Sequence, residues 1–111
     1  MAKTRVTLPT WAGRKSFQYD GSVKEGTCVY CGADFQYPCE VPADQYAAML
    51  DKFSGQEVSI GTSRTTPPNG SLGKWLTEQY GQYAMTSYIG PILLREGYAM
   101  RGSRSDRIRF K

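Results

Sequence analysis

The chain has 111 residues, of which 40% are hydrophobic and 22% charged, and its net charge is +4 at neutral pH. This composition excludes an intrinsically disordered chain, and the length suits one domain with its own core. No stretch approaches the ~18 apolar residues of a membrane span. The first residues lack the apolar run of a secretory signal. We therefore expect a cytoplasmic protein without a membrane partner.

The sequence contains no histidine. The commonest general base is therefore missing, together with the Ser-His and Cys-His nucleophile pairs. No pair of carboxylates stands at helical or strand spacing inside an apolar stretch. These absences favour a non-enzymatic protein, because a small enzyme would need a pocket that the sequence does not indicate.

The first 41 residues predict a small β-rich portion. Short strands are expected at 4–8 and 16–19, and Asp20-Gly21 is expected to form a turn after the second. The next stretch, GTCVYCGADFQYPCEVP (26–42), is expected to be a loop that carries all three cysteines.

Residues 42–111 predict a second portion, which begins with an amphipathic helix. Pro42 suits a first helical turn, and Gly55 lies just past the expected end. Five residues at helical spacing are expected to form its buried face: Ala43, Tyr46, Ala47, Leu50 and Phe53.

A short strand at 57–61 and a loop rich in helix breakers at 62–70 are expected next. Ser71 is then expected to cap a second helix that stops at Gly81. The inner face of this helix is predicted to comprise Leu72, Trp75, Leu76 and Tyr80.

A third helix is expected to begin at Thr86 or Ser87 and to end before Gly97, with Ile89, Ile92 and Leu93 on its apolar side. Pro91 falls inside this helix. It is expected to shorten or kink the helix, because proline lacks the backbone N–H that the helix needs.

The last stretch, REGYAMRGSRSDRIRFK (95–111), holds six of the 14 basic residues but only two of the 10 acidic ones. The whole excess of positive charge therefore lies here. Its alternating pattern predicts a two-stranded hairpin with a turn at 102–106. Tyr98, Met100, Ile108 and Phe110 are expected on one face of the hairpin, and Arg101, Arg107, Arg109 and Lys111 on the other.

Clustered arginines are typical of phosphate binding, since guanidinium groups match phosphate oxygens and release counterions on binding. We expect the protein to bind nucleic acid, DNA rather than RNA. The residues expected to contact phosphate are Lys74, Arg95, Arg101, Arg104, Arg107 and Arg109. An acidic protein partner is one alternative. The other is a solvated edge strand whose charges discourage aggregation.

The element order from residue 42 onward resembles the winged-helix domain, a DNA-binding variant of the helix-turn-helix. The segment YIGPILLREGYAMRGSRSDRIRF (88–110) looks like the last helix of that domain running into its wing. The resemblance implies that the third helix enters the major groove, that the hairpin touches the backbone or minor groove, and that the protein forms a homodimer. The expected fold is thus α+β: a single domain over 1–111, with a β-rich portion at 1–41 and a winged-helix-like portion at 42–111.

The outer face of the third helix offers few side chains that bond to base edges. This shortage favours the alternative function, a protein-interaction module, encoded by a mobile element, that uses the same scaffold to bind another protein.

Cys28 and Cys31 have the spacing of a zinc knuckle, CVYCG, and Cys39 would supply a third ligand. The fourth ligand would be Asp34, Glu40, Asp44 or a group from a second chain. Ordinary reduced cysteines and redox chemistry are the alternatives to zinc.

Six aromatic residues crowd the N-terminal half of the chain: Trp11, Phe17, Tyr19, Tyr30, Phe35 and Tyr37. Exposed, they would stack on single-stranded bases or anchor a protein partner. Buried, they would form the core of a small sheet, and their density favours this interpretation.

Overall fold

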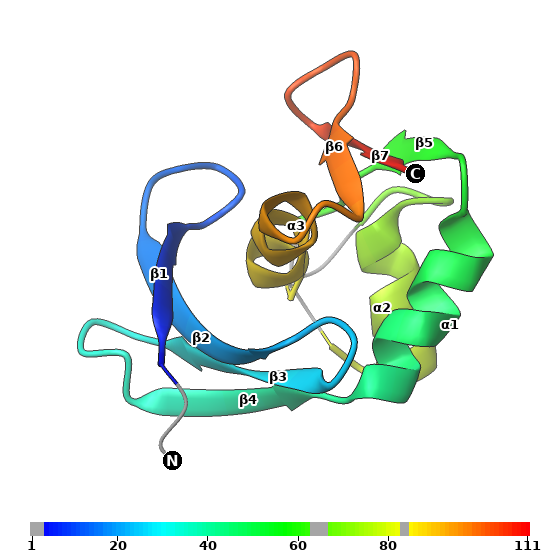
Figure 1. Cartoon of the computed structure of the whole chain (residues 1–111). Coiled ribbons are helices and arrows are strands. Elements are labelled where there is room, and N and C mark those ends of the chain that lie inside the picture. Colours follow the sequence, from blue (N-terminus) through cyan, green and yellow to red (C-terminus); the bar gives the residue numbers. More distant parts are fainter. Residues whose placement is uncertain (1–3, 63–66, 83–84) are drawn as a thin grey trace.

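A computed structural model describes residues 4–62, 67–82 and 85–111, and it has the α+β architecture that the sequence predicts (Figure 1). In chain order the elements are β1 (Val6–Pro9), β2 (Ser16–Ser22), β3 (Gly26–Cys31), β4 (Tyr37–Val41), α1 (Ala43–Phe53), β5 (Glu57–Ser59), α2 (Leu72–Tyr80), α3 (Thr86–Arg95), β6 (Ala99–Arg101) and β7 (Arg107–Phe110). The strands form two antiparallel sheets, with orders β1-β2-β3-β4 and β5-β7-β6.

The N-terminal sheet is a meander whose inner face is aromatic and β-branched. Phe17 and Tyr19 of β2 are buried on this face, as is Val29 of β3. The predicted turn at Asp20-Gly21 is wrong, because β2 continues through both residues and the chain turns at 23–25. Asp20 and Gly21 stay in the strand because they pair with Cys28 and Thr27 of β3, and a turn at this point would lose those backbone hydrogen bonds.

The predicted cysteine-bearing loop is also wrong. Most of it forms β3 and β4, which pair in register from Thr27 opposite Val41 to Cys31 opposite Tyr37. Alternating buried residues in β3 outweigh the turn-forming residues, which are confined to the connection at 32–36.

Helix α1 begins directly after Pro42, as predicted, but its buried face is rotated from the expected one. Its buried residues are Gln45, Tyr46, Met49 and Phe53. Ala47 is exposed and Leu50 only half-buried, because Met49 fills the core in their place. Gln45 is buried because its side-chain amide exchanges two hydrogen bonds with that of Gln82, at 2.6 and 3.2 Å, beyond the end of α2.

Helix α2 has both predicted caps. The Ser71 hydroxyl accepts a hydrogen bond from the Lys74 N–H at 3.0 Å, and Gly81 adopts the left-handed conformation that ends the helix. Leu72 and Leu76 are buried as expected. Trp75 is only half-buried and Tyr80 is exposed, so the inner face is narrower than predicted.

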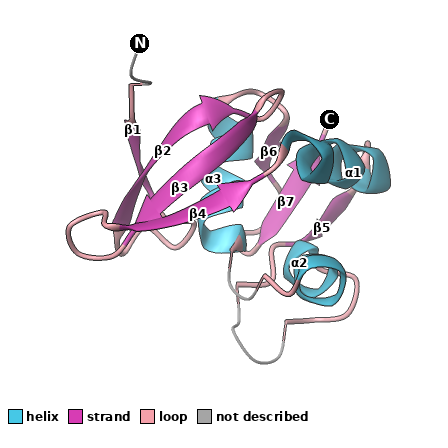
Figure 2. Cartoon of the chain, turned by 90° about the horizontal axis from the view of Figure 1, so that it is seen from below, coloured by secondary structure: helices cyan, strands magenta, loops and turns pink. Residues whose placement is uncertain are grey.

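Helix α3 lies in the middle of the molecule, between the N-terminal sheet and the β6–β7 hairpin (Figures 1 and 2). Pro91 does not end it, and the helix continues to Arg95. A proline cannot donate to the carbonyl one turn earlier, which belongs to Ser87. The backbone N–H of Trp11 donates to that carbonyl at 2.9 Å instead, so the missing helical bond is replaced from another element.

From α1 onward, the elements follow the order expected from the sequence: helix, strand, helix, helix, strand, loop and strand. The three strands of this portion form the β5-β7-β6 sheet. One continuous core joins this portion to the N-terminal sheet, with Phe17 and Val29 from the first portion and Ile92 and Phe110 from the second. In the ranges described, none of the helices is both long enough and apolar enough to cross a membrane.

Candidate nucleic-acid interface

The arginine hairpin is present, but β6 is shifted by one residue from the predicted register. Ala99 lies opposite Phe110 and Arg101 opposite Ile108, so Ala99, and not Met100, faces the core. The exit from α3 sets this register, because the backbone N–H of Tyr98 donates to Leu93 of the helix at 3.0 Å. A one-residue shift exchanges the two faces of a strand, so Met100 becomes exposed.

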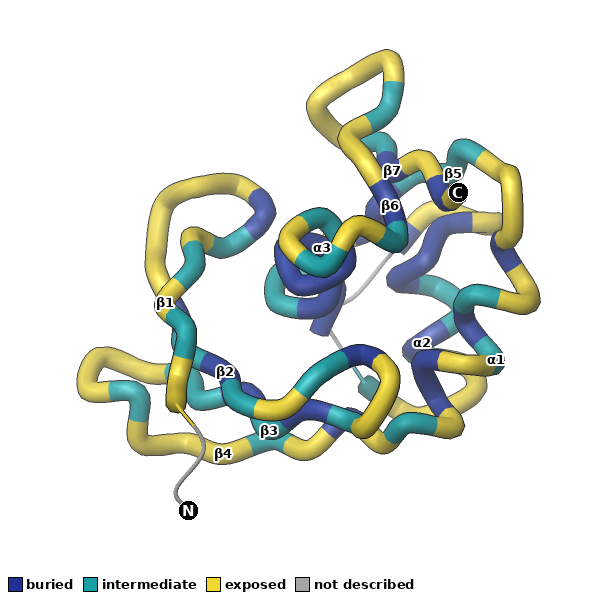
Figure 3. Tube along the Cα trace, viewed as in Figure 1, coloured by how far each residue is buried: buried dark blue, intermediate teal, exposed yellow. Residues whose placement is uncertain are grey.

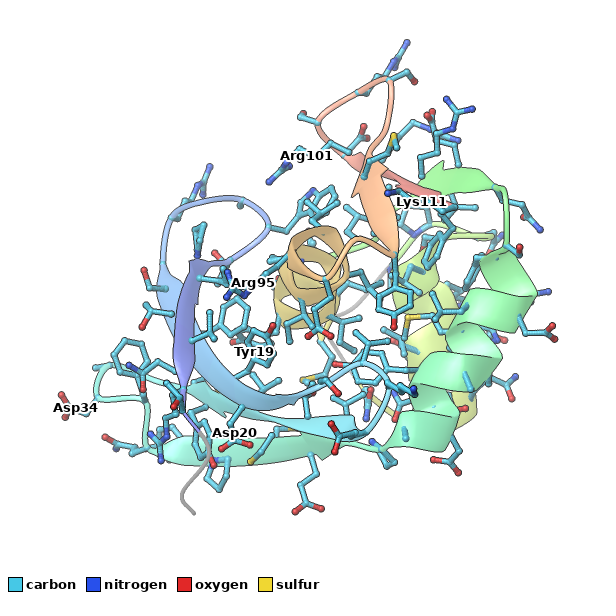
Figure 4. The ribbon with its side chains drawn as sticks, in the orientation of Figure 1. Tyr19, Asp20, Asp34, Arg95, Arg101 and Lys111 are labelled. Atoms are coloured by element: carbon cyan, nitrogen blue, oxygen red, sulfur yellow. The ribbon has the colours of Figure 1, made fainter. Side chains whose placement is uncertain are left out.

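The same shift separates Arg101 from the other hairpin cations. Its guanidinium lies over the ring of Trp11, 4.2 Å from the ring centre, and donates a hydrogen bond to the Trp11 carbonyl at 3.1 Å. In Figure 4 the Arg101 side chain extends from the hairpin toward the β1–β2 loop. Arg101 is exposed but held in place by these contacts.

Arg107 is committed to an internal salt bridge. Its Nε donates to Glu57 Oε2 at 3.0 Å, and its Nη2 donates to the Glu57 carbonyl. The Glu57 carboxylate also accepts hydrogen bonds from the backbone and hydroxyl of Ser103. Three hydrogen-bond donors lower the pKa of Glu57. The Ser103 hydroxyl has the largest effect, and the Ser103 backbone N–H and Arg107 have smaller ones. This cluster shapes the hairpin and leaves Arg107 less able to bind a ligand.

Arg104 and Arg109 are the accessible arginines of the hairpin. Arg104 is exposed at the tip, and Arg109 is exposed on the outer face of the small sheet. Within residues 4–62, 67–82 and 85–111, neither side chain has a hydrogen-bond or salt-bridge partner. Asp106 is the one acidic residue between them in the sequence.

The structure adds two cations that the sequence did not indicate. Arg14 and Lys15 are exposed on the β1–β2 loop, which lies on the same side of the molecule as the hairpin tip (Figures 1 and 3). Trp11 fixes this loop to the tip, because its Nε1 donates to the Ser105 carbonyl at 2.8 Å. The exposed cations of loop and hairpin, Arg14, Lys15, Arg101, Arg104 and Arg109, are called the basic surface below, although Arg109 lies on the opposite face of the hairpin from Arg101.

Two predicted contact residues lie elsewhere. Arg95 is exposed at the end of α3 and lies beside Tyr19, whose hydroxyl donates to Glu96 at 2.9 Å (Figure 4). Burial, together with the Glu96 carboxylate, raises the pKa of Tyr19 to about 12, although Arg95 acts in the opposite direction. Lys74 lies on α2, where it lines a cavity of about 280 Å³ with Lys52 of α1. The structure does not bring either residue into the hairpin.

Helix α3 is not arranged to enter a DNA groove. Six of its residues are buried: Thr86, Ile89, Gly90, Pro91, Ile92 and Leu93. Arg95 is its one fully exposed residue, because the N-terminal sheet and the hairpin cover its two sides. The groove-reading role that the winged-helix resemblance implies therefore has no accessible helix face here.

The cysteines do not form the turn of a zinc knuckle. Cys28 and Cys31 stand three residues apart in β3, which places them on opposite faces of the sheet. Cys39 lies opposite Val29 on the inner face and contacts Met85, with the sulfur atoms 3.8 Å apart. Burial, followed by the other two cysteines, raises the pKa of Cys39. In the described part of the chain, no three metal-binding side chains come together to hold an ion.

The aromatic residues divide between core and surface. Trp11, Phe17 and Tyr19 are buried, as the core interpretation predicted. Phe35 is half-buried, whereas Tyr37 is 60% exposed at the start of β4. Some aromatic surface therefore remains available on the β3–β4 connection.

Comparison with models of known protein families, with curated proteins and with solved structures finds no match for this chain. What the chain does must therefore be inferred from how its own residues are arranged.

Proposed function

We propose that this protein binds nucleic acid without base sequence specificity, by contacting backbone phosphates through the basic surface. The observation that carries the proposal is the tie between Trp11 and the hairpin. It holds the loop that carries Arg14 and Lys15 against the hairpin, although the two segments are almost 90 residues apart in the chain.

The chemistry of the basic surface suits phosphate. Arg104 and Arg109 have unused guanidinium donors, which match the paired oxygens of a phosphate group. Arg101 is already positioned by Trp11, so less side-chain freedom would be lost when it meets a ligand. Phosphate contacts position a protein on nucleic acid but do not read bases. Binding of this kind is consistent with the burial of α3, because no groove-reading helix is required.

The proposal is tested by the salt dependence of binding. A fluorescently labelled 20-base-pair DNA duplex is titrated with protein between 50 and 200 mM salt, and binding is followed by anisotropy. The logarithm of affinity should fall linearly with the logarithm of salt, by about 0.9 for each phosphate contacted. Changing Arg104→Ala and Arg109→Ala together should reduce this slope by about two contacts and weaken binding alike for different sequences.

A charge-matched control separates local contact from general attraction. Lys24 and Lys52 are exposed on other parts of the molecule, so Lys24→Ala with Lys52→Ala removes the same charge without touching the basic surface. The control should bind almost as the unchanged protein does. Equal losses in both double variants would refute a specific basic surface. Lack of affinity for DNA and RNA at 50 mM salt would refute the function and favour an acidic protein partner.

A further inference from the structure

A cavity of about 560 Å³ adjoins the basic surface and shares Lys15 with it. It lies among three segments that are distant in sequence. The β1–β2 region contributes Thr10, Lys15 and Ser16, the β3–β4 connection contributes Cys31, Gly32, Ala33 and Phe35, and α3 contributes Tyr88. Its volume falls within the range of about 300–1,000 Å³ that is typical of small-molecule sites.

The cavity and the basic surface are physically continuous. Lys15 belongs to both, and Thr10, on the cavity wall, is followed directly by Trp11, which holds Arg101 and the hairpin tip. A ligand group in the cavity would therefore lie next to the cations proposed to bind phosphate. A cavity next to cations suits a ligand that joins a planar group to an anionic group. A nucleotide is such a ligand, because it carries a planar base next to a phosphate.

The lining of the cavity suits a planar base. The Phe35 ring is half-buried in its wall, and Tyr88 supplies a second aromatic side chain, which packs edge-on against Phe17 with ring centres 5.2 Å apart. Thr10 and Ser16 line the β1–β2 side, and the Thr10 hydroxyl, which donates to the Lys15 carbonyl at 3.3 Å, can still accept a hydrogen bond. Aromatic side chains stack on any base, while hydroxyls bond to base edges.

The backbone at Phe35 gives independent support. Phe35 has φ of 54°, and it is the one residue other than glycine with a left-handed conformation among the described residues. A bulky aromatic residue is unusual in that conformation, and glycine would adopt it without strain. The Phe35 N–H donates to the Gly32 carbonyl at 3.1 Å, which closes a tight turn beside the cavity. Residues held in such sparsely populated conformations cluster at active sites and ligand sites.

We propose that this cavity receives one unpaired base of a single-stranded nucleic acid, stacked on Phe35, while the neighbouring phosphates contact Lys15, Arg101 and Arg104. The inference rests on the proposed function and narrows its ligand from nucleic acid in general to single strands. A base inside a duplex is paired and stacked, so it cannot enter the cavity without being extruded at a cost.

The test compares a labelled 20-nucleotide DNA strand of mixed sequence with the same strand annealed to its complement. The single strand should bind more tightly at equal salt. Phe35→Ala should weaken single-strand binding about tenfold or more, as for loss of one stacked base, and should leave duplex binding unchanged. The salt slope should also stay the same, because no phosphate contact is removed. Phe35→Tyr, which keeps the ring, should retain single-strand affinity.

Tyr37→Ala is the matched control. Tyr37 lies two residues from Phe35 and is more exposed, but it does not line the cavity. Single-strand losses as large in Tyr37→Ala as in Phe35→Ala would overturn the cavity proposal in favour of stacking on the open surface. Equal affinity of the unchanged protein for both probes would also overturn it, while the basic surface would stand. Failure to bind either probe would instead refute the proposed function itself.

Discussion

Trp11 is the residue whose removal should affect both stability and the basic surface. Trp11 is 5% exposed. Its backbone N–H donates to the Ser87 carbonyl of α3, and its indole N–H donates to the Ser105 carbonyl at the hairpin tip. Truncating a buried tryptophan to alanine costs about 3–5 kcal/mol. The hydrogen bond to Ser105 and the contact with Arg101 are each worth about 1 kcal/mol, and they overlap with that figure. We therefore expect Trp11→Ala to lower the free energy of unfolding by about 4 kcal/mol.

Urea unfolding, followed by circular dichroism, measures this loss. Trp11→Phe keeps most of the ring packing but removes the N–H that Ser105 accepts, so it should cost only about 1 kcal/mol. A loss below ~1 kcal/mol for Trp11→Ala would show that the loop is not held on the hairpin. Arg14 and Lys15 would then not be held near the hairpin arginines, and the basic surface would not form as proposed.

A double-mutant cycle with Gly90 tests the packing directly. A methyl group at Gly90 would lie 2.6 Å from the Trp11 ring and 3.1 Å from Ile60. Gly90→Ala alone should therefore destabilise the protein by about 1–3 kcal/mol through overpacking. In the Trp11→Ala background most of that cost should disappear, because the ring is gone. Additivity of the two changes within ~0.5 kcal/mol would contradict the contact between Trp11 and α3.

Three further outcomes are expected. Leu76→Ala should cost about 2–5 kcal/mol in urea unfolding, since Leu76 is fully buried, and a loss under ~0.5 kcal/mol would contradict its placement. Because the pKa of Glu57 is lowered in the folded protein, the ionised Glu57 carboxylate stabilises the fold above its usual pKa of about 4.3. The difference in thermal stability between the unchanged protein and Glu57→Gln should therefore shrink as pH falls below ~4. A difference that grows on acidification would refute this. Because Cys28 faces away from Cys31 in β3, a chelator should leave the melting temperature unchanged, whereas one tightly bound zinc per chain would contradict the structure.

Most helices could be predicted because their signals are local. The Ser71 cap and the Gly81 stop depend on a few neighbouring residues, and both were confirmed. The face of α1 was less predictable, because Met49 and Leu50 are both apolar and the tertiary packing buries Met49 and leaves Leu50 half-buried. Likewise, the turn-forming residues of the cysteine-bearing segment favour a loop locally, whereas its strands form because β3 pairs with both β2 and β4.

The candidate site was only partly predictable for the same reason. The charge of the hairpin was visible because its arginines are contiguous, and Arg104 and Arg109 are exposed as expected. Arg14 lies near the hairpin because Trp11 bonds to Ser105 and Arg101, which are 94 and 90 positions further along the chain. Arg107 likewise forms its salt bridge with Glu57, which lies 50 residues away in the sequence. No local pattern encodes either contact.

The distribution of acidic groups gives the basic surface an effect greater than the net charge suggests. Asp20, Glu25 and Glu40 line a shallow cavity of about 370 Å³ on the outer side of the N-terminal sheet. Figure 4 shows Asp20 and Asp34 at the opposite end of the molecule from Arg101. The molecule is 38 Å long, whereas the screening length is about 10 Å at 0.1 M salt. Under the proposed function a nucleic acid would be attracted to the hairpin end, whereas Arg5, which lies over the Tyr30 ring, offsets part of the negative charge on the sheet. The field would orient the encounter before any contact forms, so added salt should slow association as well as weaken binding.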